Sequence, residues 1–229
     1  MEIVLSPRLR AVAGLVRPGS VVADIGTDHA YLVCWLVASA RCPGGFACDI
    51  NPLPLERARK TIAQYGLTGQ VQAVLSDGLA GLKQAQFDDV VIAGMGGELI
   101  AQIIQSAPWA RQHTRFLLQP MTKPERLREW LAGNGFAVLK EVAVQESRFV
   151  YPILEVAHTG QTARATVFDA WVGKMWENTD EAASRYLQKV HRQMKQAQRG
   201  VLRKSNAAYA LEFDQTICRI QQRLEGQLP

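Results

Sequence analysis

The stretch 21–31 constrains the fold more than any other part of this 229-residue chain. Short apolar residues run into Asp24, Gly26 and further polar residues follow, and a second apolar run begins at Ala30. This order predicts a strand, a tight turn and a helix, the ligand-binding corner of a doubly wound α/β sheet. Gly26 lets the backbone turn sharply and approach a ligand. Asp24 is then expected at the carboxyl end of the strand, where such sheets bind ligands.

The same corner lacks the glycine pattern of a dinucleotide site. That pattern, G-x-G-x-x-G, places a pyrophosphate on the N-terminus of the helix, whereas here Asp28 stands at the second glycine position. Carboxylates at Asp24 and Asp28 would repel a pyrophosphate, and they suit a ligand with an ammonium or sulfonium group. The corner, which also contains Thr27, therefore predicts a binding site for S-adenosylmethionine.

Composition and charge fit an ordinary soluble protein with a substantial core. Apolar residues make up 48% of the chain and charged residues 21%, and the length suits one large domain or a standard domain with an appendage. The longest nearly uncharged apolar run, 30–40, is far shorter than the roughly 20 residues of a membrane span, and we expect no signal peptide. The four cysteines show no C-x-x-C spacing, so we expect reduced thiols, no metal site and a cytoplasmic protein.

Hydrophobic periodicity predicts alternating helices and strands up to about residue 133. The expected helices are one within 1–18, 30–39, 53–65, 79–84, 98–105 and 123–132, and the expected strands are 20–23, 46–48, 71–75, 87–93 and 115–118. In the first of these helices, Ser6 is a possible N-cap and Pro7 the first helical residue. Two further strands, 136–144 and 149–157, follow each other without a helix. A hairpin that closes an otherwise parallel sheet is typical of methyltransferases, whereas nicotinamide-binding domains keep a helical crossover. We therefore predict a class I, Rossmann-like methyltransferase domain over 1–159.

The remaining part, 160–229, is helical in pattern and is predicted to form a second domain. After a short linker, Thr179 or Asp180 can cap a helix that reaches about residue 204, and another helix covers about 207–224. Apolar residues recur along both helices at steps of three and four. Two such helices joined by a short turn predict an antiparallel coiled-coil hairpin.

Two further acids follow the second and third predicted strands. Asp49, with Ile50 beside it, occupies the place at which an acid accepts hydrogen bonds from ribose hydroxyls. Asp77 could accept one from an adenine amine, and Gly78 would allow close approach of the backbone. The alternatives are an acid that complements a helix dipole for Asp49 and a plain turn for Asp77. Because parallel strands end at one edge of the sheet, we predict that these residues share the cofactor site with Asp24.

Gly94-Met95-Gly96-Gly97 follows the fourth predicted strand, where this fold brings a methyl donor and its target together. The glycines would expose backbone groups to a flat ligand, and Met95 could pack on an adenine ring. We predict that Gly94 and Met95 contact the cofactor and that Gly96 and Gly97 contact the substrate. A tight strand-to-helix turn is the alternative.

A long stretch with positive and no negative side chains marks the first predicted C-terminal helix. Residues 1–159 carry a net charge of +1 and residues 160–229 one of +4, and no Asp or Glu occurs between Ala182 and Leu211. Six cations in this interval step by three or four and so share one helix face, here named the basic stripe: Arg185, Lys189, Arg192, Lys195, Arg199 and Arg203. Contact with the phosphates of a nucleic acid accounts for such a face. The alternative is a merely solvated basic surface.

With these residues in place, the chain resembles the bacterial TrmK family of tRNA (adenine-N1)-methyltransferases over essentially its whole length. The resemblance rests on a few segments: Asp24–Leu32, Ser76–Leu79, Ile92–Gly97, and Leu118–Pro120 before Leu127–Leu131. The family has a class I methyltransferase domain followed by a coiled-coil domain. It methylates N1 of adenine 22 in the D-arm of tRNA.

The resemblance implies an S-adenosylmethionine-dependent enzyme with tRNA as its partner, no membrane contact, no metal, and a monomeric or weakly dimeric state. It places His29 and Tyr31 near the reacting centre, although a lone His beside a helix is also a common structural residue. Asp28 or His29 could accept the N6 proton of the adenine or hold its amino group. Eight residues would line the cofactor pocket: Asp24, Gly26, Asp28, Asp49, Asp77, Gly78, Gly94 and Met95.

Three other functions are compatible with the residues. A nicotinamide-dependent oxidoreductase would also use Asp49 on a ribose, although Asp28 and the terminal hairpin argue against it. A non-catalytic RNA-binding protein would fail to bind the methyl donor. A methyltransferase for another RNA base or for a small molecule would share the cofactor site, and the basic stripe argues against the small molecule.

Overall fold

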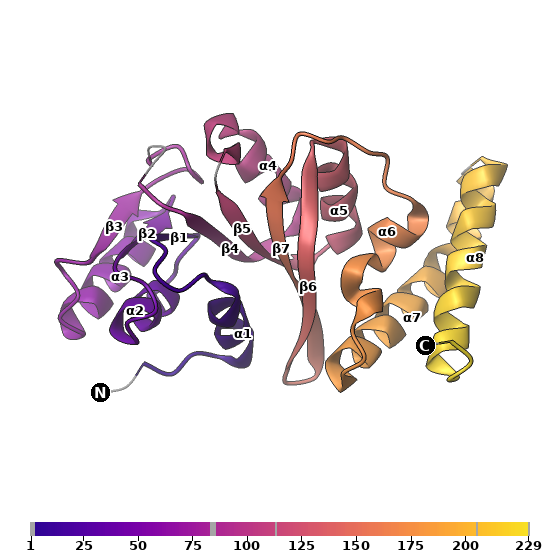
Figure 1. Ribbon diagram of the computed structural model, residues 1–229, viewed down its shortest axis with the longest axis horizontal. Helices are drawn as coiled ribbons and strands as arrows, with labels where there is room; N and C mark the ends of the chain where they lie inside the picture. Colours follow the sequence, from indigo (N-terminus) through magenta and orange to yellow (C-terminus); the bar gives the residue numbers. More distant parts are fainter. Residues whose placement is uncertain (1–2, 83–85, 113, 205, 229) are drawn as a thin grey trace.

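A mixed seven-stranded sheet forms the centre of the computed structural model, which describes residues 3–82, 86–112, 114–204 and 206–228. The strand order is β3-β2-β1-β4-β5-β7-β6 (Figure 1). The strands are β1 (Val22–Ile25), β2 (Gly45–Asp49), β3 (Val71–Leu75), β4 (Asp89–Gly96), β5 (Arg115–Thr122), β6 (Phe136–Glu146) and β7 (Phe149–His158). β1 to β5 are parallel, and β7 runs antiparallel to both β5 and β6. The predicted Rossmann-like methyltransferase sheet with its closing hairpin is confirmed.

Helices cover both faces of the sheet. α1 (Pro7–Leu15), α2 (Tyr31–Ala38) and α3 (Pro52–Gln64) pack on one face, and α4 (Gly97–Gln105), the 3-10 helix η1 (Pro108–Arg111) and α5 (Pro124–Gly133) pack on the other. In Figure 1, α1 and α2 lie below the sheet and α4 lies above it. α1 begins as predicted, because Ser6 caps it and Pro7 is its first residue. All four residues of β1 are buried, as expected for a strand covered on both faces.

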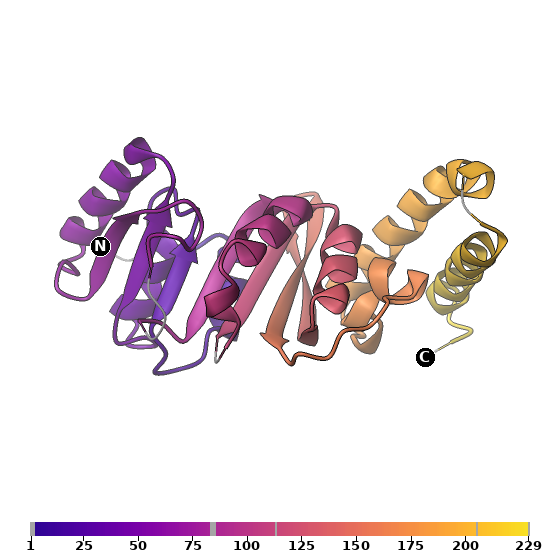
Figure 2. The same ribbon diagram turned by 90° about the horizontal axis from the view of Figure 1, so that it is seen from above.

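The C-terminal helices lie at the β6 end of the sheet, at the right of Figures 1 and 2. They are α6 (Val167–Trp171), the 3-10 helix η2 (Gly173–Glu177), α7 (Glu181–Lys204) and α8 (Ala207–Leu224). Asp180, one of the two predicted caps, accepts a hydrogen bond from the Ala183 amide at 2.8 Å. A third hydrophobic core joins α7, α8 and the hairpin, and it includes Val150, Tyr186, Met194, Phe213 and Ile217. A division into domains at residues 159 and 160 stays a prediction.

A buried charged cluster ties α5 and β6 to the C-terminal helices. Arg128 on α5 donates from Nε to Glu141 on β6 (3.1 Å) and from Nη2 to the Tyr186 hydroxyl on α7 (3.0 Å). It also donates to the Ala170 carbonyl in α6 (2.7 Å). The three side chains are at most 4% exposed. A buried carboxylate and a buried guanidinium are tolerated only as a pair, so this junction cluster of Arg128, Glu141 and Tyr186 fixes the helices against the sheet.

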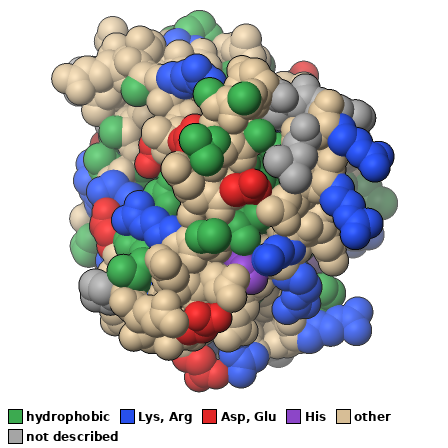
Figure 3. All heavy atoms as spheres, turned by 90° about the vertical axis from the view of Figure 1, so that its right-hand side faces the viewer, with side chains coloured by type: hydrophobic (Ala, Val, Ile, Leu, Met, Phe, Trp, Pro, Cys, Tyr) green, Lys and Arg blue, Asp and Glu red, His purple; other side chains and the backbone are tan. Residues whose placement is uncertain are grey.

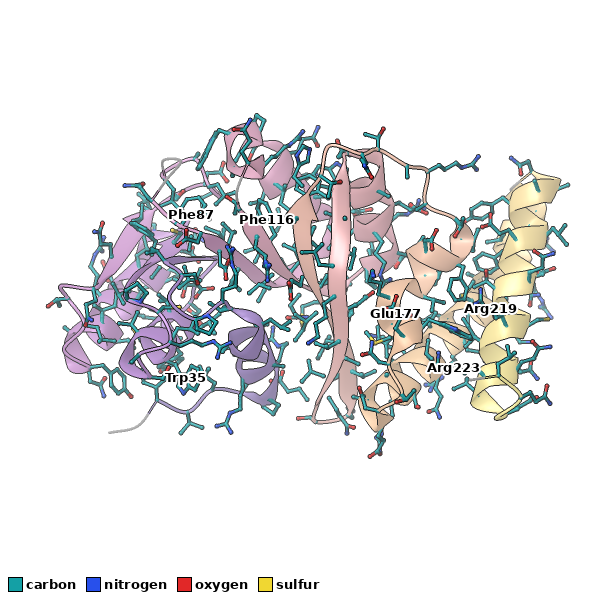
Figure 4. All side chains as sticks on the ribbon, viewed as in Figure 1. Trp35, Phe87, Phe116, Glu177, Arg219 and Arg223 are labelled. Atoms are coloured by element: carbon teal, nitrogen blue, oxygen red, sulfur yellow. The ribbon has the colours of Figure 1, made fainter. Side chains whose placement is uncertain are left out.

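Two arginines of α8 hold that helix against η2 (Figure 4). The Arg219 and Arg223 guanidinium groups lie 4.8 and 4.5 Å from the centre of the Trp176 ring. Arg219 also lies 4.1 Å from the Phe168 ring, and Arg223 donates to the Asn178 carbonyl at 2.8 Å. These contacts use two cations of the C-terminal part for packing between helices.

The structure differs from the prediction at several elements, of which three lie near the strand ends. β4 continues through the glycines to Gly96, because its pairing with β5 extends that far with an irregular register around Met95. Residues 79–82, which were predicted to begin a helix, form turns, and residues 83–85 lie outside the described residues. β5 runs past Pro120 to Thr122. Within the described ranges, every helix is too short or too polar to cross a membrane.

Candidate active site

A cavity of about 340 Å³ opens where β1 and β4 end and α1 and α2 begin. It brings together seven residues that the sequence predicted for the site: Asp24, Gly26, Thr27, Asp28, His29, Tyr31 and Gly94. Five others complete its lining: Arg8, Leu9, Ala30, Leu32 and Ala93. No group of His, Cys, Asp or Glu in the described ranges could hold a metal ion.

Asp24 forms the buried base of this cavity. Its side chain is nearly inaccessible, at 7% exposure, and it accepts a hydrogen bond from Thr27. The Thr27 hydroxyl oxygen in turn accepts from the Ala30 amide at 3.0 Å. Burial raises the pKa of Asp24 to about 6, and the Thr27 hydrogen bond opposes this increase. Asp24 is therefore a carboxylate that gains from a cationic ligand more than a solvated acid would.

Gly26 is required by the shape of the corner. Its φ is +77°, and its amide donates to the Cys48 carbonyl at 2.8 Å, which links the turn to the end of β2. A Cβ at this position would lie 2.0 Å from Cε of Met95. Met95 thus contacts the turn, and any other residue at position 26 would have an unfavourable φ and would require the flexible end of Met95 to move.

Asp28 and its neighbours form the exposed rim. The Asp28 carboxylate lies 3.0 Å from Arg57 Nη1 on α3 and 3.3 Å from His29 Nε2. The rings of His29 and Tyr31 stack with their centres 5.2 Å apart. The positive charge of Arg57 offsets the charge of Asp28. The sequence suggested that Asp24 and Asp28 together attract a cationic ligand, but in the structure this attraction comes mainly from Asp24.

Asp49 and Asp77 lie along the same edge of the sheet, outside the described lining of the cavity. Asp49 ends β2, and its carboxylate accepts from the Asn51 amide at 2.8 Å. Ile50 and Asp77 are exposed. Gly78 has a φ of +54°, and a Cβ there would lie 2.9 Å from the Ile103 side chain, so packing alone requires glycine. The cofactor contacts of these residues stay predictions.

The glycine run after residue 93 divides into two parts. Gly94 faces the cavity with a φ of +81°, and a Cβ there would lie 3.2 Å from Arg8 Nη1. Gly96 instead faces the end of β5, and Gly97 faces the start of α5, where a Cβ would lie 2.4 Å from the Lys123 carbonyl oxygen. The predicted substrate contact of Gly96 and Gly97 remains a prediction, and helix packing already explains Gly97.

Sequence reasoning missed a polar network at the wall of the cavity. Arg8 donates from Nη1 to Gln119 Oε1 (2.7 Å), and the same oxygen accepts from the Gly94 amide (3.0 Å). Gln119 is fully buried within β5, and Arg8 also pairs with Glu146 on β6 (3.3 Å). A glutamine directly after the buried Leu118 was the available signal, because a buried amide must find partners.

Comparison with known proteins places this site in a family. The family model for a methyltransferase domain matches residues 5–154. A curated relative from Bacillus subtilis (strain 168), a tRNA (adenine(22)-N(1))-methyltransferase, is 37% identical over 160 residues, or 69% of this chain and 67% of the relative. The chain belongs to the TrmK family.

Solved structures of TrmK proteins and of their relatives cover nearly all of this chain. A putative tRNA (m1A22) methyltransferase from Streptococcus pneumoniae, in complex with S-adenosyl-L-methionine, has a TM-score of 0.80 and 28% identity over 96% of this chain and 100% of its own. TrmK from M. capricolum, in complex with S-adenosyl-homocysteine, has a TM-score of 0.75 and 28% identity over 96% and 98% of the two chains.

In this member of the TrmK family, the basic stripe is not uniformly solvated. Lys189 is half-buried, because its Nζ donates to the Val150 carbonyl on β7 (3.0 Å), and burial lowers its pKa. The predicted phosphate contact of Lys189 stays a prediction. Arg185 is exposed and pairs with Glu181 (2.8 Å), and Arg192, Lys195, Arg199 and Arg203 are also exposed. Figure 3 shows Lys and Arg side chains gathered on the right-hand side of the C-terminal end of the molecule.

Proposed function

We propose that this chain transfers the methyl group of S-adenosylmethionine to N1 of adenine 22 in the D-arm of tRNA. The observation that carries the proposal is the buried Asp24 at the base of the cavity, in a chain that is 37% identical to a tRNA (adenine(22)-N(1))-methyltransferase. Within the described residues, the Asp24 carboxylate accepts a hydrogen bond from the neutral hydroxyl of Thr27. A buried anion without a cationic partner suits a cationic ligand.

The residues present fit this cofactor. When bound, S-adenosylmethionine supplies a methyl group on a positively charged sulfur. Asp24 would hold its ammonium group, Asp49 its ribose hydroxyls and Asp77 its adenine amine, so each carboxylate would meet a hydrogen-bond donor. The three acids lie at or near the carboxyl ends of β1, β2 and β3, which are neighbours in the sheet, and this order suits a ligand extended across the strand ends. Gly94, with its positive φ, allows close approach of the backbone.

The chain's own residues position the base and accept a proton. N1 of the adenine attacks the methyl carbon as the carbon–sulfur bond breaks, so the base must be held about 3 Å from the methyl group and in line with the sulfur. The base must also leave its stack to enter the cavity. The stacked rings of His29 and Tyr31 offer it an aromatic surface. The methylated adenine is a cation that loses a proton from N6, and Asp28 or His29 accepts that proton.

The proposal assigns tRNA docking to residues 160–229, as a coiled-coil domain distinct from the methyltransferase domain of 1–159. The exposed cations of the basic stripe would neutralise backbone phosphates. Such an enzyme works in the cytoplasm, where tRNA is found, as a monomer or weak homodimer.

Incubation with methyl-labelled S-adenosylmethionine and an unmodified tRNA transcript tests the proposed reaction. Digestion to nucleosides should give labelled 1-methyladenosine, and a transcript with guanine at position 22 should stay unlabelled. Label in another nucleoside would refute the assigned base. A protein that binds the donor and labels no tRNA would refute the assigned substrate. Thermal stabilisation by NAD and not by the methyl donor would support the oxidoreductase instead.

Charge reversal tests the role of the basic stripe. The triple variant Arg192→Glu, Lys195→Glu and Arg199→Glu should bind tRNA more weakly and with a smaller salt dependence, by about 0.7 to 0.9 in the log–log slope for each lost phosphate contact. Its affinity for the cofactor should be unchanged. Reversal of the exposed Arg59 and Lys60 on α3, at the opposite end of the molecule, is the matched control (Figure 1). Equal tRNA binding by both variants would refute this role.

A further inference from the structure

A second concave surface lies between the turn of the β6–β7 hairpin and α7. It encloses about 360 Å³, and we name it the hairpin groove. Its lining consists of Gln145, Arg148, Phe149, Val150, Arg185, Gln188, Lys189 and Arg192. Four of these eight side chains are cationic and none is acidic. Three of the eight, Arg185, Lys189 and Arg192, belong to the basic stripe. The groove forms only where the fold brings α7 and the hairpin together, so the stripe alone does not define it.

An exposed aromatic ring forms one wall of the groove. Phe149 begins β7 beside the turn, and 51% of it is accessible. The Arg148 guanidinium lies 5.0 Å from the centre of this ring. A flat ring next to a cation is the arrangement by which proteins bind single-stranded nucleic acid, because a base can stack on the ring while its phosphate meets the charge.

Tyr151 links the groove to the wall of the active-site cavity. Arg8, which lines the cavity, has its guanidinium 6.0 Å from the centre of the Tyr151 ring. Lys189, which lines the groove, has Nζ 5.5 Å from the same centre, and the Phe149 ring centre lies 6.2 Å from it. Arg8 also pairs with Glu146, which ends β6 next to the turn. Phe149 and the Arg8 wall of the cavity are therefore neighbours, each in contact with Tyr151.

Lys189 has a separate role in this surface. Its Nζ donates to the Val150 carbonyl at 3.0 Å and lies 5.9 Å from the centre of the Tyr186 ring. These contacts hold α7 against the hairpin and set the width of the groove. The groups left free to meet a ligand are the exposed Arg148 and Arg192, with Arg185 partly engaged by Glu181.

We propose that the hairpin groove binds an unpaired nucleotide of the RNA substrate next to the target adenine. Its base stacks on Phe149, and its phosphate lies between Arg148 and Arg192. An acidic peptide would also meet the positive charge, but it would leave the aromatic ring without a flat partner. The inference rests on the proposed tRNA methyltransferase function and adds to it a binding subsite on the sheet hairpin.

Substitution of the ring tests the stacking. Phe149→Ala should weaken tRNA binding about tenfold, as expected for the loss of one stacked base, and should raise KM for tRNA similarly. The affinity for S-adenosylmethionine and kcat at saturating tRNA should stay at the wild-type level. Phe149→Trp should restore tRNA affinity, because it keeps a flat ring. Leu139→Ala removes a comparably exposed side chain from β6 and should bind tRNA as the wild type does.

A fluorescent base gives a readout that a structural role would not change. In a tRNA with 2-aminopurine next to adenine 22, the wild type should quench the fluorescence, and Phe149→Ala should not, at protein concentrations that saturate binding. Arg148→Gln should lower the slope of log affinity against log salt by about 0.7, the value for one single-strand phosphate contact.

The outcomes separate this inference from the proposed function. The wild type could methylate adenine 22 while Phe149→Ala shows the same tRNA affinity, KM and quenching as the wild type. That result would overturn the proposed role of the groove and leave the proposed methyltransferase function intact. Cofactor binding without any methylation of tRNA would instead overturn the proposed function. A loss of affinity in Leu139→Ala equal to that in Phe149→Ala would also overturn the groove, because the effect would then not depend on the ring.

Discussion

Substitution of Asp24 by Asn should stabilise the ligand-free protein while it impairs cofactor binding. Asp24 is 7% exposed and receives a hydrogen bond from the neutral hydroxyl of Thr27, and burial raises its pKa from 3.8 to about 6. A folded protein that holds a carboxyl in this way loses stability when the carboxyl must ionise at neutral pH. Asn has nearly the same shape and no charge, so the variant avoids this cost.

The magnitude follows from the change in pKa. A tenfold change in an ionisation constant is worth about 1.4 kcal/mol, so the change from 3.8 to about 6 corresponds to about 3 kcal/mol at pH 7. The weaker bond from Thr27 to an amide would reduce the gain to about 1–3 kcal/mol, or a few degrees in Tm.

The sign of the pH dependence is fixed by the raised pKa. Between pH 3.8 and about 6 the folded state binds more protons than the unfolded state, so the stability of the wild type falls as the pH rises through this window. The stabilisation of Asp24→Asn should therefore be complete above pH 6 and vanish near pH 4. Urea denaturation at pH 4, 5, 6 and 7.5 measures it, with Asp49→Asn at the end of the next strand as the control.

Cofactor binding should change in the opposite direction. Loss of a charged hydrogen bond should weaken S-adenosylmethionine binding about 10- to 100-fold, as measured by calorimetry. The wild-type affinity should also fall below pH 6, because the ammonium group must then displace a proton from Asp24. A variant that is less stable than the wild type at pH 7.5 and binds the cofactor normally would refute the reasoning on both counts.

Three other substitutions test the site and its support. His29→Ala should lower kcat at least about 100-fold without changing cofactor affinity, and full turnover would exclude a role in proton transfer. Gly26→Ala should destabilise the fold by about 1–3 kcal/mol through its positive φ, and the double variant with Met95→Ala should recover only the steric part in urea titrations. Arg128→Met should cost about 3–5 kcal/mol because it leaves Glu141 buried without its partner, and Arg128→Met with Glu141→Leu should cost less; equal costs would refute the pairing.

The sequence predicted those parts of the site that depend on neighbouring residues. A glycine and acids at strand ends follow from local backbone rules, so Asp24, Gly26 and the closing hairpin could be inferred. Contacts between distant segments could not. Arg8 and Gln119 are separated by 111 positions and meet only because α1 packs against β5.

Two features of the structure do not follow from the local sequence pattern, for related reasons. Helical spacing places Lys189 on the same face as Arg192, but it does not say how far the contact with the hairpin extends around α7, and Lys189 lies inside that contact. Glycine is a poor strand former, which suggested that β4 ends before Gly94, yet pairing with β5 carries the strand on to Gly96. In both cases tertiary contacts overrode a local preference.

The junction cluster has a consequence for target selection. Arg128, Glu141 and Tyr186 are buried and join the sheet directly to α7, so the helix that would hold the RNA backbone cannot swing freely relative to the cavity that would receive the base. The distance between that helix and the cavity would then be fixed. The enzyme would select the nucleotide whose distance from the bound phosphates matches this fixed separation. Inserting or deleting one nucleotide between the bound phosphates and the target should therefore move the modification along the RNA.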